Sequence, residues 1–238
     1  HEYYLTEDKE FAVIVITNVL QMGFLNANQS QEYESNLKQF LNDSLPCLCR
    51  FVKFSPTVDN CNAIKIAIET YPNHSEQIAP IILSTLLEVI DSCGIYKESC
   101  TIGIDNAAST FAIALDTFYN SSHVCEKFDL SAGYEKWMNY MPMHCDKKSA
   151  HVGVEKLLLH LLSSTSPIRK ERIIEVLLNT IEIEFVDGDV LRHIESQISI
   201  VCEKWNKETI HSLSNLSEIQ KIKLEQIIVQ SVNGLSNK

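Results

Sequence analysis

Apolar residues recur every three or four positions along most of this chain, which is the spacing of one face of an α-helix. Residues 75–94 show the pattern clearly, and similar patterns predict helices over about 7–22, 149–162 and 217–232. We find no alternation of strands with crossover helices and no repeat of fixed period. The pattern therefore predicts an all-α protein, a bundle of about nine or ten helices.

Helix boundaries are predicted by capping residues and prolines. Ser55-Pro56 has the form of an N-cap followed by proline at the first helical position, and Ser217 with Gln220 has the form of a capping box. Pro46 is expected to kink or restart the helix that contains it, because proline removes a backbone donor.

Two polar intervals suggest how the helices are grouped. One lies near Lys147 to Ser149, and the other is the serine- and threonine-rich stretch 163–166. We expect an N-terminal, cysteine-rich helical half over residues 1–147 and a C-terminal helical half over 148–238, packed on each other. A single domain is the alternative.

Composition and charge exclude some classes of protein. The counts of Gly 7 and Pro 6 are low, which favours helices over a turn-rich sheet protein. A net charge of −11 opposes binding to a phosphate backbone, so we expect no nucleic-acid partner. The longest apolar run, 78–90, is too short for a bilayer and is interrupted by Glu88, so we expect no membrane span.

The chain has eight cysteines without the paired spacing of zinc ligands, and we interpret them as a disulfide framework that staples the helices. The candidates are Cys47, Cys49, Cys61, Cys93, Cys100, Cys125, Cys145 and Cys202. Proximity suggests the pairs Cys93–Cys100 and Cys125–Cys145, although eight cysteines allow about 105 pairings. Cys202 would bridge back to an earlier segment. The alternative is a set of buried free thiols in a cytosolic helical protein.

Other features favour an exported glycoprotein. The chain begins with His1 rather than Met, as a mature protein does after signal-peptide removal. Five asparagines lie in N-x-[ST] acceptor sequences, namely Asn28, Asn42, Asn73, Asn120 and Asn215. With the even number of cysteines, these features predict a secreted, extracellular location.

The sequence offers no recognisable catalytic or cofactor site. The nucleophile-elbow, zinc-protease, P-loop and dinucleotide-binding motifs are absent. His151 and His160 would lie on opposite faces of one helix, which argues against a metal site with His144. The acidic cluster Glu182, Glu184, Asp187 and Asp189 is interpreted as a solvated helix end and turn. We expect no catalytic residues, no metal and no cofactor.

Apolar ligand binding is a second possibility for a helical bundle. The candidate residues are Phe111, Phe118, Trp137, Tyr140 and the segment 152–162, with Phe111, Leu115 and Leu158 lining the cavity. Ordinary core packing explains the same residues.

Two cysteine–tyrosine–cysteine units give a first family resemblance. They are Cys93-Tyr96-Cys100 and Cys125-Tyr134-Cys145. This pairing resembles the motifs of the aphid secreted bicycle effectors, and it implies a salivary effector injected into a plant, with Tyr96 and Tyr134 as motif tyrosines. The segment 145–162 is also similar to the insect 27 kDa haemolymph glycoproteins. Neither family implies catalytic residues for this chain.

These observations together predict a secreted, non-enzymatic effector or interaction protein. It would act by binding a protein partner outside the producing cell, including a protein of a host organism. The alternative is an extracellular carrier of a lipid or small apolar ligand in a helical cavity.

Overall fold

The computed structural model describes residues 16, 31–92, 101–181, 188–203 and 207–235. In these residues the protein is all-α, with twelve helices and no strand, which confirms the predicted fold class. The described residues hold more helices than the expected nine or ten, and three of them, α4, α7 and α12, have only four or five residues each. The helix predicted over 7–22 lies outside the described residues.

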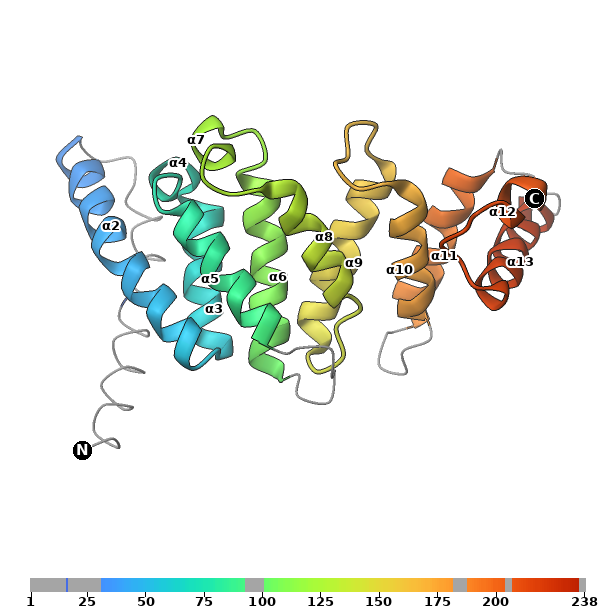
Figure 1. The fold of residues 1–238 in the computed structure, drawn as a ribbon, viewed down its shortest axis with the longest axis horizontal. Coiled ribbons are helices and arrows are strands. Elements are labelled where there is room, and N and C mark those ends of the chain that lie inside the picture. The colour runs from blue at the N-terminus through green and yellow to red at the C-terminus, as the bar shows by residue number, and fades with distance from the viewer. Residues whose placement is uncertain (1–15, 17–30, 93–100, 182–187, 204–206, 236–238) are drawn as a thin grey trace. The chain divides into compact units, whose positions relative to one another are not determined.

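The helices follow one another through short connections (Figure 1). Their bounds are α2 Gln31–Phe54, α3 Val58–Thr70, α4 Pro72–Ser75, α5 Ala79–Ser92, α6 Ile102–Thr117, α7 Ser122–Cys125, α8 Leu130–Tyr140, α9 Lys147–Leu162, α10 Lys170–Ile181, α11 Gly188–Cys202, α12 Lys207–His211 and α13 Glu218–Leu235.

The chain divides into two compact units, residues 1–137 (unit 1) and 138–238 (unit 2). The division falls within α8, whereas the sequence placed its boundary near Lys147, where α9 begins. The division into 1–147 and 148–238 stays a prediction.

Unit 1 is built on four long helices. Helix α2 packs against α3 and α5, and α6 packs against the same two helices (Figure 1). Helix α6 is rich in small residues, and twelve of its sixteen residues are buried. Small side chains allow close approach of neighbouring helices, so α6 forms much of the core of this unit.

Unit 2 is built on the long helices α9, α10, α11 and α13. Helix α9 packs against α10 and α11, α13 packs against α10 and α11, and α12 packs against α13. Buried leucine, isoleucine and valine fill the space between them, including Leu157, Ile174, Leu177, Ile198 and Leu224. Only four of the fifteen residues in α11 are buried.

Some helix boundaries lie where capping residues and prolines predicted them, and others do not. The capping box is confirmed: the Gln220 N–H donates to Ser217 Oγ at 3.2 Å, and the Ser217 N–H donates to Gln220 Oε1 at 2.9 Å. The prediction of Ser55 as an N-cap is wrong, because Thr57 caps α3 by accepting from the Asn60 N–H. Of the two effects expected at Pro46, the restart of the helix is also wrong, since α2 continues through it.

Candidate functional site

The cysteines are the first candidate group. Among the residues that the structure describes, no two cysteines form a disulfide, so the predicted staples are not seen there. Cys93 and Cys100 lie outside these residues. Cys47 and Cys125 are exposed, whereas Cys49, Cys61 and Cys202 are buried.

The three buried thiols are part of the helix packing. Burial raises the pKa of Cys49, Cys61 and Cys202 each to about 12, because a thiolate is poorly solvated in an apolar core. The Cys61 thiol donates to the Gly103 carbonyl at 3.8 Å, where α3 meets α6. A thiol with a raised pKa is a weak nucleophile at neutral pH. These three side chains therefore have the properties of core residues.

The motif tyrosine Tyr134 also has a structural role. Its buried hydroxyl donates to Asp116 Oδ1 at 2.9 Å, and its ring meets Tyr119 edge-on at a centroid distance of 6.2 Å. Burial, followed by the Asp116 carboxylate, raises the pKa of Tyr134 above its usual value. Tyr96, the other motif tyrosine, lies outside the described residues.

The predicted glycosylation sites have different environments. Asn73 and Asn120 are exposed beyond the ends of α3 and α6, whereas Asn42 is half-buried within α2. Asn215 is exposed, but its amide donates to the Glu171 carbonyl at 3.1 Å and to the Glu175 carboxylate at 3.2 Å. Asn28 lies outside the described residues.

The structure does not assemble a metal site from the described residues: no group of three His, Cys, Asp or Glu side chains there is arranged to hold an ion. Asp189 pairs with Arg192 one turn along α11. Glu182, Glu184 and Asp187 lie outside the described residues. His144, His151 and His160 are described, but they belong to no such group.

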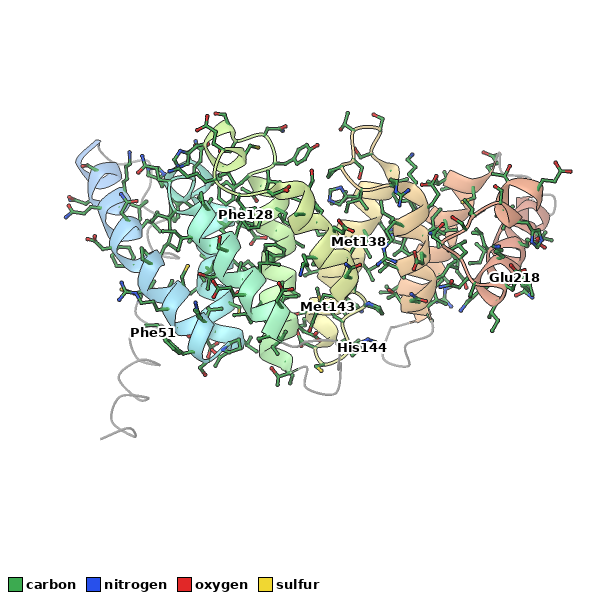
Figure 2. All side chains as sticks on the ribbon, viewed as in Figure 1. Phe51, Phe128, Met138, Met143, His144 and Glu218 are labelled. Carbon is green, nitrogen blue, oxygen red and sulfur yellow. The ribbon has the colours of Figure 1, made fainter. Side chains whose placement is uncertain are left out.

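The candidate ligand-lining residues are packed together. Phe111 meets Phe128 edge-on at a centroid distance of 6.2 Å; Phe128 is labelled in Figure 2. A β-carbon added to Gly133 would lie 2.9 Å from the Phe128 ring and 3.0 Å from Leu115. There is no space for even a methyl group at this point, so core packing explains Phe111 and Leu115 better than a ligand cavity.

The remaining residues proposed for a cavity are also mostly buried. Phe118, Trp137 and Leu158 are buried, and Tyr140 is half-buried. The buried indole N–H of Trp137 has no hydrogen-bond partner among the described residues. Segment 152–162 has its apolar side chains divided between the core, as in Leu157 and Leu161, and solvent, as in Leu159 and Leu162.

An exposed apolar cluster, which the sequence analysis missed, lies where three helices of unit 1 end or begin. Phe54 ends α2 and is 83% exposed, Val58 begins α3, and Ile102 begins α6 and is 50% exposed. We call these three residues the corner patch. Phe51, one turn before Phe54, marks this end of α2 in Figure 2.

Close backbone packing holds the corner patch together. A β-carbon on Gly103 would lie 1.7 Å from the Pro56 carbonyl oxygen, so the α2–α3 connection rests directly on the start of α6. Asn60 also donates to the Ser55 carbonyl at 2.9 Å. The three apolar side chains are therefore presented by a fixed backbone. In the sequence each of the three residues lies at a helix boundary, where apolar periodicity does not predict whether a side chain is exposed.

The two units differ strongly in charge. Residues 1–137 hold eight Lys and Arg against 18 Asp and Glu, a net charge of −10, whereas residues 138–238 hold 12 against 13, a net charge of −1. Near the corner patch, Asp59 is exposed in the first turn of α3, and Lys53 is paired with Glu88 at 2.5 Å. Unit 1 therefore favours cationic partners.

None of the described helices combines the length and hydropathy that a membrane span requires. Comparisons of this chain with protein-family models, with curated proteins and with solved structures find no match. The two family resemblances stay predictions.

Proposed function

We propose that the protein is an exported, non-enzymatic interaction protein that binds a partner protein outside the producing cell through the corner patch. The observation that carries this proposal is the exposure of Phe54, Val58 and Ile102 on closely packed backbone. A large exposed aromatic side chain among aliphatic neighbours is typical of a binding surface, where such residues contribute most of the affinity.

The charge of unit 1 defines the chemistry of the partner. With a net charge of −10 on residues 1–137, association is favoured for a partner segment that has apolar side chains flanked by Lys or Arg. The apolar contacts provide affinity and the charges raise the association rate. Such binding weakens as salt rises, because the Debye length shortens to about 3 Å at about 1 M ionic strength.

The exposed acceptor asparagines of unit 1 are compatible with this surface. Asn73 follows the far end of α3 and Asn120 the far end of α6, while Val58 and Ile102 begin these helices. Ser121 Oγ and Glu76 Oε1 lie 2.5 Å apart, so the segments that follow the two asparagines meet at that end. A sixteen-residue helix such as α6 is about 24 Å long, so glycans there would leave the corner patch uncovered.

The export proposal includes disulfide bonds, and we expect these bonds to leave out the three buried thiols. Cys47 and Cys125 are exposed and Cys145 is partly exposed, and Cys93 with Cys100 is the pair that proximity suggests. The test is mass spectrometry of unreduced protein from its native source. Export predicts disulfide-linked peptides and glycopeptides at Asn73 or Asn120. Eight free thiols and no glycan would contradict it.

Binding is tested by selecting peptides from a random phage-displayed library on the folded protein. We expect sequences that combine aromatic or aliphatic residues with Lys or Arg. Phe54→Ser and Ile102→Ser should each weaken the selected peptides about tenfold or more. Ile81→Ser is the matched control, because Ile81 is 51% exposed on α5 and lies outside the corner patch.

Two results would contradict the binding proposal. One is a library that yields no enriched sequence. The other is an enriched sequence that binds the Phe54→Ser and Ile102→Ser proteins as tightly as it binds the unmodified protein.

A further inference from the structure

Helix α13 has apolar side chains on two opposite faces. Leu224 and Ile227 are buried against the rest of unit 2, which accounts for one face. Ile219, Ile222 and Val229 are 74%, 53% and 57% exposed. At about 100° per residue, the mean direction of these three lies roughly opposite Leu224. An amphipathic surface helix normally exposes a polar face, so this second apolar face requires an explanation.

The exposed apolar residues have the spacing of a helix-pairing seam. Ile219, Ile222, Gln226 and Val229 follow one another at intervals of three, four and three residues, and Gln226 is also exposed. This is the alternation of a and d positions in a heptad, with Ile219 and Gln226 at a, and Ile222 and Val229 at d. We call these four residues the α13 stripe. Its spacing is that of a surface that pairs with another helix side by side.

Charges beside the α13 stripe indicate which helix it pairs with. In this heptad register Glu218 and Glu225 occupy g positions, and Lys223 occupies an e position. In a parallel pair of identical helices, a g residue lies opposite the e residue five positions later on the other helix. Glu218 of one copy would therefore face Lys223 of the other. An antiparallel pair would instead place like charges opposite each other.

We propose that the α13 stripe binds a second copy of this chain, in a parallel, two-fold symmetric pairing of the two α13 helices. The side chains at the edge are positioned for this arrangement. Glu218 is exposed at the start of α13 (Figure 2), where it accepts from Lys221 Nζ at 2.9 Å, so its carboxylate is ionised and available for an additional cation. Glu225 Oε1 lies 2.9 Å from His211 Nε2, which ties α12 to α13.

The folded unit reduces the cost of pairing. Most of the stability of a helix in a protein comes from tertiary packing, and α13 is already held by its buried face. The near-neutral charge of unit 2, a net −1, also avoids strong repulsion between two copies of this region. The polar Gln226 in the α13 stripe favours in-register pairing, as polar residues at a positions do in coiled coils.

The test is sedimentation equilibrium of the full chain over a range of concentrations. We expect a species of twice the 27.0 kDa monomer mass to appear as concentration rises. Ile222→Glu should weaken self-association at least about tenfold, because it places two carboxylates at one d position. Ile81→Glu, an equally exposed isoleucine of unit 1, should leave self-association unchanged.

A charge exchange tests the parallel orientation separately. Glu218→Lys and Lys223→Glu should each weaken self-association, because each places like charges across the seam. The double variant should restore it to within about threefold, because opposite charges again face each other. Circular dichroism checks that every variant stays folded.

The proposal is overturned by any of three results: sedimentation as a monomer at every concentration, a dimer that Ile222→Glu leaves intact, or a double variant that associates no better than the single ones.

Discussion

Helix α6 of unit 1 and helix α11 of unit 2 are buried to very different extents. In unit 1, α6 has twelve of its sixteen residues buried, and its small side chains allow direct backbone contact at Gly103. In unit 2, α11 has four of fifteen residues buried, and α13 has a second apolar face in solvent. Unit 1 also has a net charge of −10, against −1 for unit 2. Helices with similar periodic patterns therefore range from α6, which is packed on most sides, to α13, which keeps a second apolar face in solvent.

The largest expected effect comes from two glycines, one in each unit. Gly103→Ala places a β-carbon 1.7 Å from the Pro56 carbonyl oxygen, so the backbone must move, at a cost of about 3 kcal/mol or more. Gly188→Ala in unit 2 meets no atom within 4 Å and should stabilise the start of α11 by up to about 1 kcal/mol.

Urea unfolding of the two glycine variants checks this contrast. Trp137 is fully buried in unit 1, so its fluorescence in a Trp205→Phe background reports on that unit. Far-ultraviolet circular dichroism follows all helices. Equal effects of the two substitutions would remove the claim that backbone packing is tighter in unit 1.

Helix caps are expected to have the next largest effect. The Asp146 carboxylate caps α9 by accepting from the Ser149 N–H at 2.9 Å and from the Ser149 hydroxyl at 2.6 Å. Thr101 caps α6 through one longer bond, 3.4 Å from the Ile104 N–H. We expect Asp146→Ala to cost about 1.5 kcal/mol and Thr101→Ala about 0.5 kcal/mol.

Thermal unfolding of both cap variants tests which of them loses more stability. Asp146→Asn is a control that keeps an N-cap acceptor. A larger loss for Thr101→Ala than for Asp146→Ala would contradict the prediction.

Alkaline pH should affect unit 1 more than unit 2. Among the residues that the structure describes, unit 1 has the buried thiols Cys49 and Cys61 and unit 2 has Cys202, each with its pKa raised from 9.0 to about 12. The unfolded chain loses these protons first, so the thiols contribute full stability below pH 9, and this contribution is lost as pH rises from 9.0 towards about 12. Between about pH 9 and about pH 10 each buried thiol should lower the free energy of unfolding by about 1 kcal/mol.

Unfolding monitored through Trp137 at each pH measures the slope of the free energy of unfolding of unit 1 against pH. Cys61→Ala should make that slope shallower and leave the slope for unit 2 unchanged. If Cys61→Ala does not change the pH dependence, the Cys61 thiol titrates normally in the folded protein.

Surface ion pairs should have the smallest effect. Lys136 and Asp91 in unit 1 are 3.2 Å apart and both about half exposed, so Asp91→Asn should cost about 0.3 kcal/mol. In unit 2, Arg172 lies 2.6 Å from Glu175 and also donates to Asn139 at 2.8 Å. Arg172→Met should cost about 1 kcal/mol because it removes two contacts of a partly buried side chain. Chemical denaturation in low and high salt measures the free energy of unfolding of both variants. Equal losses of stability for Asp91→Asn and Arg172→Met would contradict the prediction.

The sequence predicted the elements better than the surfaces. Apolar periodicity identified the all-α class, and the Ser217–Gln220 capping box was found because all of its bonds are local. Thr57 was missed as a cap because the neighbouring Ser55-Pro56 has an equally good local pattern. The close approach of Gly103 to Pro56 joins segments far apart in sequence, which no local pattern encodes.

The candidate sites show the same division. Sequence identified the cysteines and acceptor asparagines by type, but it did not separate buried Cys61 from exposed Cys47, since that depends on which face of a helix is packed. The exposure of Phe54 and of the α13 stripe was missed for a related reason. An apolar residue at helical spacing is normally assigned to the core, and only the packed structure reveals the exceptions.

Stability and peptide binding measured on the same Phe54→Ser protein test the proposed binding surface most directly. We expect a free energy of unfolding within about 0.5 kcal/mol of the unmodified protein, because Phe54 is exposed, together with at least a tenfold loss of affinity for the selected basic, apolar peptides. A protein that loses stability while it keeps its affinity would assign Phe54 to the core and contradict the proposed binding surface.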